Sequence, residues 1–577
     1  MKKKSGCLKA LALLAVTFVA LIAMWCLTNF RSTVRDGHPL VQVSPETTCL
    51  DGPLDENGDV DYVEALNLEL SDGVTLDNNA VIKFLEGLGP VMDGTPVDSE
   101  VFRRLAIERP SKTGVYWIEF SKWLNEQGID YSSHVEEESF VESYPWAAEE
   151  FPVVERWYQR NQRPMEAIRE GAKRPRYYYP LIPDPSASAA MLSLKFYSTQ
   201  AMRNLARFFQ ISAMRHLGRD DASAALQELL AIYRLGNLVR QGKFLIDDLV
   251  GFAIIGIADS GVTTVCASGK ATSQELKDFM RELDKIPPAG GLAESLGSAE
   301  RYFMLDTIVT IGRGDTDTGQ AISASRNNYM KGTLGQLGIK TIDWQECLTI
   351  VNHWYERASE VVKIVDPVKQ EKELNVFNRE LMQLRKAGRS STNLVTTVLG
   401  TRRAKGKAVG EMMAYNLMPD LSLLLGVEQR RDTYMERVKV VLAVAGYKKD
   451  NGRFPENLEV LVPEYFPSVP KDCFSFSPIQ YEVIKNDDAE DSVLIYSVGK
   501  NGVDEGGQNN QMNSGNAAGD DWGIDWSIKT WEQIQAERLG AEAAFDGNDF
   551  MEEDTQSDVS DGESDLPHSP KPSGKQE

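Results

Sequence analysis

The sequence predicts a mainly α-helical protein with an N-terminal membrane helix, a large irregular helical domain, a small C-terminal α+β module and a disordered acidic tail. Three observations carry this prediction. Apolar residues recur at helical spacing through most of the chain. Short segments separated by prolines follow from about residue 435, and acidic residues are concentrated near the C-terminal end. The expected divisions are an n-region and membrane anchor (1–30), a connector (31–75), the helical domain (76–434), the α+β module (435–530) and the tail (531–577).

The composition is that of an ordinary globular protein with an acidic balance. Of the 577 residues, 42% are hydrophobic and 25% charged. Lysine and arginine number 62 and aspartate and glutamate 85, so the formal net charge is −23. Proteins that bind nucleic acids through the phosphate backbone are typically basic. Because this chain is acidic, we expect no nucleic-acid partner.

The first 30 residues have the pattern of a membrane anchor. Lysines at positions 2–4 precede an apolar run from Ala10 to Leu27, about as long as a membrane-spanning helix requires. Because these lysines outweigh Arg31 and Arg35, we expect a single-pass protein of the inner (cytoplasmic) membrane with most of the chain extracytoplasmic. A cleaved signal peptide and a lipoprotein lipidated at Cys26 are the alternatives. The run is long for a signal peptide, and the residues before Cys26 lack the small side chains of a lipidation site.

Four cysteines lie outside the anchor, at Cys49, Cys266, Cys347 and Cys473. They allow two disulfides in three pairings. Their wide separation argues against a zinc site, and unpaired buried thiols are the alternative to disulfides. The sequence leaves this choice open.

Within the connector, the acidic segment from Asp55 to Tyr62 invites comparison with a calcium-binding EF-hand loop. Such a loop starting at Asp55 needs glycine where Val60 stands and glutamate where Leu66 stands. The EF-hand interpretation fails, and an Asx/Gly turn leading into a helix over Tyr62–Leu68 is the prediction.

The helical domain is expected to begin with a helix over residues 80–88. Asp77 or Asn78 can cap its start, and Gly89 followed by Pro90 marks its end. A helix so clearly punctuated needs no tertiary information to be predicted.

Residues 188–284 have the densest helical periodicity. We expect one helix ending at Gly218, a second from a cap at Asp220 or Asp221 to Gly242, a third over Phe244–Ala267, and a fourth opened by the capping box Thr272-x-x-Glu275. Short turns predict antiparallel hairpins. The stretch LGRDDASAALQELLAIYRLG is similar to a tetratricopeptide repeat, but no 34-residue period recurs, so an irregular bundle is preferred to a repeat array.

Three acidic residues, Asp247, Asp248 and Asp259, accompany the apolar third helix and could form a carboxylate cluster. Asp247 and Asp248 fall in its first turn, where a carboxylate stabilises the positive end of the helix dipole. Capping is therefore the prediction for these two.

Beyond this region the chain becomes glycine-rich over 312–340, where we expect a surface loop because no phosphate-loop spacing is present. Helices are predicted over 341–365 and 367–387. A basic stretch over 385–407 follows, and it predicts a solvated face or an acidic partner.

Near residue 435 the pattern changes. A helix is expected to end at Asn451 and Gly452, before short pieces punctuated by prolines. Residues Gln480–Ile484 and Ser492–Ser497 are rich in β-branched residues and predict an antiparallel hairpin, so the module is α+β. The last 37 residues carry 11 acidic and two basic side chains, which cannot bury enough apolar surface to fold.

The module resembles the soluble domain of the major pseudopilin of type II secretion systems. The resemblance covers about residues 435–527 and rests on YKKDNGRFPENLEVLVPEYFPSVPKD, IQYEV, LIYSVGKNGVDEGG and GDDWGIDW. Its most specific elements are Pro470-x-Asp472 and Tyr496-Ser497-x-Gly499. It implies a helix packed on a small sheet.

The same resemblance implies a calcium site, because an acidic loop after the Tyr-Ser-x-Gly element binds calcium in that family. Asp504, Asp520 and Asp521 fall in the corresponding positions and are the expected metal ligands. The insertion QNNQMNSGNAAG lengthens this loop. A solvated acidic loop without calcium is the alternative.

The chain is not itself a pilin subunit. About 400 residues separate the anchor from the module, and Leu11 stands where a pilin has glutamate. The whole arrangement, including DYVEALN and DGVTLDNNAV near the start, resembles membrane-anchored proteins of planctomycete-type bacteria, a resemblance that implies no activity.

No catalytic motif accompanies this organisation. G-x-S-x-G and H-E-x-x-H are absent from the sequence, and its five histidines lack metal-ligand spacing. We therefore expect an interaction or scaffold protein of the cell envelope, with protein partners and no catalysis. The alternatives are an accessory component of a secretion or pilus-like machine and an exported carboxylate-based hydrolase.

Overall fold

The computed structural model describes residues 38–92, 94–195, 197–315, 339–388, 400–485, 491–507 and 522–524. By its contacts the chain divides into Met1–Ile528 and Lys529–Glu577, and every described residue belongs to the first unit. The expected membrane helix and acidic tail lie outside the described residues, as does most of the expected loop over 312–340.

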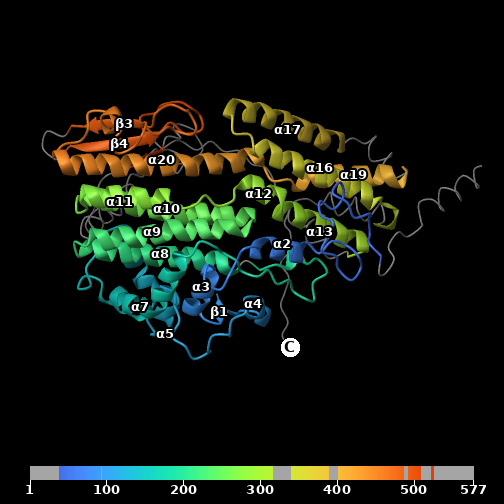
Figure 1. Ribbon diagram of the computed structural model, residues 1–577, viewed down its shortest axis with the longest axis horizontal. Coiled ribbons are helices and arrows are strands. Elements are labelled where there is room, and N and C mark those ends of the chain that lie inside the picture. The colour runs from blue at the N-terminus through green and yellow to red at the C-terminus, as the bar shows by residue number, and fades with distance from the viewer. Residues whose placement is uncertain are drawn as a thin grey trace, which may run out of the picture. The chain divides into compact units, whose positions relative to one another are not determined.

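The described chain is mainly helical, as predicted (Figure 1). Its α-helices are α2 (Tyr62–Ser71), α3 (Ala80–Leu88), α4 (Ser99–Arg104), α5 (Phe120–Glu126), α6 (Val135–Ser143), α7 (Pro152–Ala172), α8 (Tyr197–Gly218), α9 (Ala222–Val239), α10 (Leu245–Ser268), α11 (Ser273–Asp284), α12 (Leu292–Gly297), α13 (Ala299–Arg313), α16 (Trp344–Val362), α17 (Pro367–Gly388), α19 (Arg402–Leu417) and α20 (Leu421–Asn451). Short 3₁₀ turns lie at Tyr131–Ser133, Met191–Ser193, Arg240–Gly242, Ile339–Thr341 and Leu458–Leu461.

Helices α8, α9 and α10 pack on one another in the order of the chain, as the short turns between them predict (Figure 1). Asp221 caps α9 by accepting a hydrogen bond from the Ala224 amide at 3.0 Å. Thr272 and Glu275 form the predicted capping box at the start of α11. These local signals are confirmed.

The predicted cap of α3 is wrong by one residue. Asn79 is the N-cap and accepts from the Val81 amide, whereas Asn78 closes the preceding turn through hydrogen bonds with Thr75 and Gly73. The side chain of Asn79 also donates to the Tyr178 carbonyl at 2.9 Å. The capping bond is local, whereas the contact with Tyr178 lies 99 residues away and could not be seen in local patterns.

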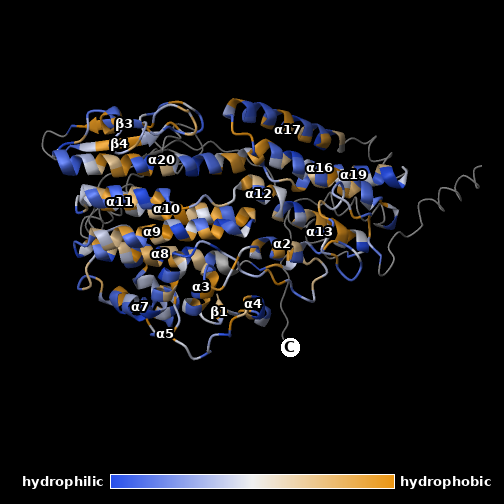
Figure 2. Cartoon of the chain, viewed as in Figure 1, coloured by the Kyte–Doolittle hydropathy of each residue, from blue (hydrophilic) through white to orange (hydrophobic). Residues whose placement is uncertain are grey.

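Apolar residues line the inner faces of the helices and form the core (Figure 2). Helix α10 is long and apolar enough to span a membrane by length and composition, yet most of its apolar window is buried. Its buried side packs against α8, α9 and α20, so within the described chain it serves as a core helix.

The segment from residue 38 to α2, expected to be a polar connector, contributes to this core. The predicted turn is present: the Asp55 carboxylate accepts from the amides of Asn57 and Asp59, and it leads into α2. Leu40, Val60 and other residues of this segment are buried against side chains of α13 and α16. The helical core therefore starts before the predicted boundary at residue 76.

The C-terminal module contains the predicted hairpin with its predicted bounds, β3 (Gln480–Ile484) and β4 (Ser492–Ser497). Tyr481 lies opposite Ile495, and β5 (Trp522–Ile524) pairs antiparallel with the other edge of β4. A separate two-stranded ribbon joins β1 (Val91–Met92) and β2 (Thr95–Pro96).

Helix α20 belongs to both parts of the chain. It follows α19 in the chain, packs on α10, and along its second half packs on α11 and β4 (Figure 1). It ends at Asn451, with Gly452 in the left-handed conformation at φ +69°, as predicted. One uninterrupted helix thus crosses position 435, where the sequence pattern changes.

Candidate functional site

The candidate site is an acidic cleft between the Asp55–Asp61 turn and α13. It has a volume of about 510 Å³. Its charged lining residues are Asp55, Asp59, Asp61, Asp306, Arg313 and Asp315. Acidic groups from two distant parts of the sequence therefore face one cavity.

The turn positions its carboxylates through its own backbone. Gly58 takes φ +80°, which the tight turn requires, and Asp61 caps α2 by accepting from the Glu64 amide at 2.9 Å. Asp59 is 5% exposed and accepts from the Leu40 amide at 2.7 Å while pairing with Arg313 of α13. Arg313 thereby fixes the turn against the helix.

Asp306 enters the cleft from α13. One carboxylate oxygen accepts from the Met191 amide at 2.9 Å. Burial raises the pKa of Asp306 to about 7, and the carboxylates of Asp61, Asp55 and Asp59 add to that rise. Burial also raises the pKa of Asp59. Asp306 is therefore a carboxyl group that exchanges its proton near neutral pH.

This arrangement has the elements of acid–base chemistry, in which one carboxyl group holds a proton while a neighbour is ionised. It does not form a metal centre. Across the described residues, no group of three His, Cys, Asp or Glu side chains is placed to hold a metal ion.

The predicted calcium loop is described in part. Asp504 follows β4, and its Oδ1 accepts from the Tyr496 hydroxyl and from the Gly506 amide, each at 2.9 Å. Asp520 and Asp521 lie outside the described residues. The described chain supplies only one of the three expected ligands, and the calcium site remains a prediction.

The three acidic residues of α10 have three different partners. Asp247 accepts from the Phe244 amide at 3.3 Å, so capping is confirmed for this residue. Asp248 instead pairs with Arg240 at 3.2 Å and accepts from the Ser295 hydroxyl at 2.7 Å, both in the interior. Asp259 accepts from the Tyr233 hydroxyl. The capping prediction is wrong for Asp248 because α12 and the end of α9 supply closer partners.

The sequence interpretation did not identify Asp306. The sequence feature that could have revealed it is a carboxylate inside the apolar run MLDTIVTIG, because a buried charge needs a compensating partner or access to a cavity.

The four cysteines, Cys49, Cys266, Cys347 and Cys473, are all free thiols, and burial raises the pKa of each. Unpaired thiols are thus the arrangement that the structure has.

Comparison with known proteins gives no relative: no protein-family model matches the chain, and no curated protein or solved structure matches it.

Proposed function

We propose that the protein is an interaction or scaffold protein of the bacterial cell envelope, anchored in the inner membrane by Ala10–Leu27 and otherwise extracytoplasmic. The observation that carries this proposal is α20, which is shared by the helical body and the module. A helix common to two parts fixes their surfaces relative to each other, as a platform for partner proteins requires.

Side-chain contacts between α11 and the module support the same proposal. Ser273 donates to Asp450 at 2.6 Å, and Lys277 pairs with Glu464 at 2.6 Å while its ammonium lies 4.5 Å from the Tyr465 ring. These contacts hold the C-terminal module against the helical domain on the side of α20 that faces α11.

Photo-crosslinking in intact cells tests the proposal. A crosslinkable residue is placed at Val503 in the module and at Val368 on α17, which are 56% and 78% exposed. We expect defined protein adducts from both positions and retention of the chain in the membrane fraction. A chain with a cleavable signal peptide in place of residues 1–30 is the control. A soluble wild-type protein without adducts would contradict the proposal.

The resemblance of the module to a pseudopilin domain supports a narrower version, in which the partner belongs to a secretion or pilus-like machine. Neighbouring secretion proteins among the adducts of Val503 would favour that version. Partners of unrelated classes would favour a general scaffold.

The acidic cleft supports a second candidate, an exported carboxylate-based hydrolase. Asp306 would donate a proton to the leaving group, and an ionised carboxylate of the turn would accept one from water. A panel of hydrolase substrates, compared between wild type, Asp306→Asn and the exposed control Glu166→Gln, tests it. Turnover that Asp306→Asn abolishes and Glu166→Gln preserves would support this function.

A further inference from the structure

A second cavity differs in charge from the rest of the chain. It has a volume of about 410 Å³ and lies between the C-terminal ends of α7, α9 and α11. Its polar lining residues are Lys173, Arg174, Arg234, Asn237, Glu282 and Lys285. Four cations and one carboxylate thus face a single cavity in a protein whose formal net charge is −23.

The single carboxylate is shared by two of the cations. Glu282 lies 3.1 Å from the Arg234 guanidinium and 2.6 Å from the Lys285 ammonium. The hydrogen bond from Lys285 lowers the pKa of Glu282, so this carboxylate is ionised at neutral pH. Glu170, outside the lining, also lies 3.8 Å from the Arg174 guanidinium, so the four cations have two carboxylates beside them and keep a positive excess.

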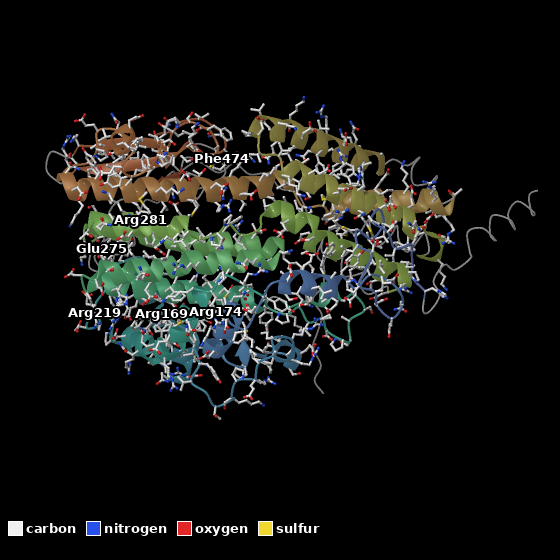
Figure 3. The ribbon with its side chains drawn as sticks, viewed as in Figure 1. Arg169, Arg174, Arg219, Glu275, Arg281 and Phe474 are labelled. Carbon is white, nitrogen blue, oxygen red and sulfur yellow. The ribbon has the colours of Figure 1, made fainter. Side chains whose placement is uncertain are left out.

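Helix-end electrostatics explain part of this excess. Lys173 and Lys285 are the C-caps of α7 and α11, where a cation stabilises the negative end of the helix dipole. Arg174 donates to the carbonyls of Leu76 and Asn79 at 2.8 and 2.9 Å. Figure 3 labels Arg174, which follows the end of α7, and Arg169, which lies within that helix.

The cation from α9 lies just before the last turn of that helix, and within the described residues its only ion pair is with the shared Glu282. Asn237 follows Arg234 one turn later on the same face. Asn237 is 8% exposed, and its Oδ1 accepts from the Ala289 amide at 3.1 Å. Asn237 also lines the cavity, and its side-chain amide can donate a hydrogen bond close to the guanidinium of Arg234. An amide donor beside a guanidinium is a polar arrangement suited to an anion.

We propose that this cavity binds a small oxyanion-bearing molecule of the phosphate-ester class. Arg234 and Lys285 engage the anion, Asn237 donates a hydrogen bond, and Lys173 and Arg174 supply long-range attraction. The planar guanidinium matches two phosphate oxygens, and the cavity volume falls within the usual range for small-molecule sites. Glu282 competes with the ligand for the same two cations.

Calorimetric titration of the full-length chain in detergent with pyrophosphate tests the proposal. We expect Arg234→Gln to weaken binding at least about tenfold, because it removes the central cation. Removal of the internal competitor in Glu282→Gln should strengthen binding several-fold. Lys372→Gln, an exposed lysine on α17, should leave the affinity unchanged.

Three results would overturn the proposal: no heat of binding with about 10 mM pyrophosphate, equal affinity in wild type and Arg234→Gln, or weaker binding by Glu282→Gln. If Arg234→Gln fails to fold, the double variant of the surface lysines, Lys173→Gln with Lys285→Gln, serves in its place and should also weaken binding. Affinity that falls with added sodium chloride is expected, since the attraction is electrostatic.

Discussion

Asp472 accepts a hydrogen bond from the hydroxyl of Ser497, with 2.9 Å between Oδ2 and Oγ. The same oxygen accepts from the Val498 amide at 3.1 Å, and the other carboxylate oxygen accepts from the Phe474 amide at 2.8 Å. Asp472 is 1% exposed. One buried carboxylate therefore ties the loop before β3 to the end of β4 and joins the two most specific sequence elements of the module.

We expect Asp472→Ala to lower the free energy of unfolding of the module by about 2 to 4 kcal/mol, because it leaves three donors without their acceptor. Chemical denaturation followed by aromatic fluorescence measures the change. Glu482→Ala, at an exposed position of β3, is the control and should stay within about 0.5 kcal/mol of wild type. Equal stability of the two variants would show that Asp472 does not hold the module together.

The stability of the protein should fall as the pH rises through about 8, because burial raises the pKa of Asp247 to about 8. The folded state then binds this proton more tightly than the unfolded state, whose aspartate pKa is about 4. The stabilisation is complete below pH of about 4 and is lost as the pH rises through the folded-state pKa.

Thermal melts at pH 6 and pH 9 check this sign. The melting temperature of wild type should fall more between pH 6 and pH 9 than that of Asp247→Asn. This variant retains an acceptor for the Phe244 amide but does not titrate. Parallel behaviour of the two proteins would contradict the assignment.

Two glycine-to-alanine substitutions should have opposite effects. At Gly218 an added Cβ would collide with the backbone carbonyl of Trp146, so Gly218→Ala should destabilise by about 1 to 3 kcal/mol. At Gly256, inside α10, a Cβ would meet nothing within 4 Å, and Gly256→Ala should stabilise by about 0.5 to 1 kcal/mol. Denaturant midpoints measure both. A stabilising Gly218→Ala would mean that α8 and the Trp146 segment are not packed as described.

Calcium at about 1 mM should raise the free energy of unfolding by on the order of 1 kcal/mol, because the loop from Asp504 to Asp525 is expected to bind it with the weak affinity typical of exported modules. Melts of the full-length chain with calcium and with a chelator test this expectation. Asp520→Ala or Asp521→Ala should remove the difference, whereas Glu456→Ala, elsewhere on the module surface, should retain it. Identical melts of wild type in both conditions would refute a calcium site.

Elements with local start and stop signals could be predicted from the sequence. The hairpin strands, the capping box at Thr272 and the end of α20 at Gly452 each depend on residues within a few positions of one another. The general fold class, mainly helical with a small sheet, followed from the same local patterns.

The candidate site could not be predicted in the same way, because its partners are distant in sequence. Asp59 meets Arg313 across 254 residues, and Asp306 accepts from Met191 across 115 residues. Neither the sequence of the acidic turn nor that of α13 indicates that the two pack against each other. Periodicity predicts that each forms, whereas only tertiary packing brings them to one cavity.

Helix α20 has a mechanical consequence. Its 31 residues make a rod of roughly 46 Å at 1.5 Å per residue. Apolar side chains near its start pack with α16 and α19, and those of its second half are almost all inaccessible to water. A load applied to the strands is therefore transmitted along one continuous helix to α10 and α11, on which α20 packs most extensively.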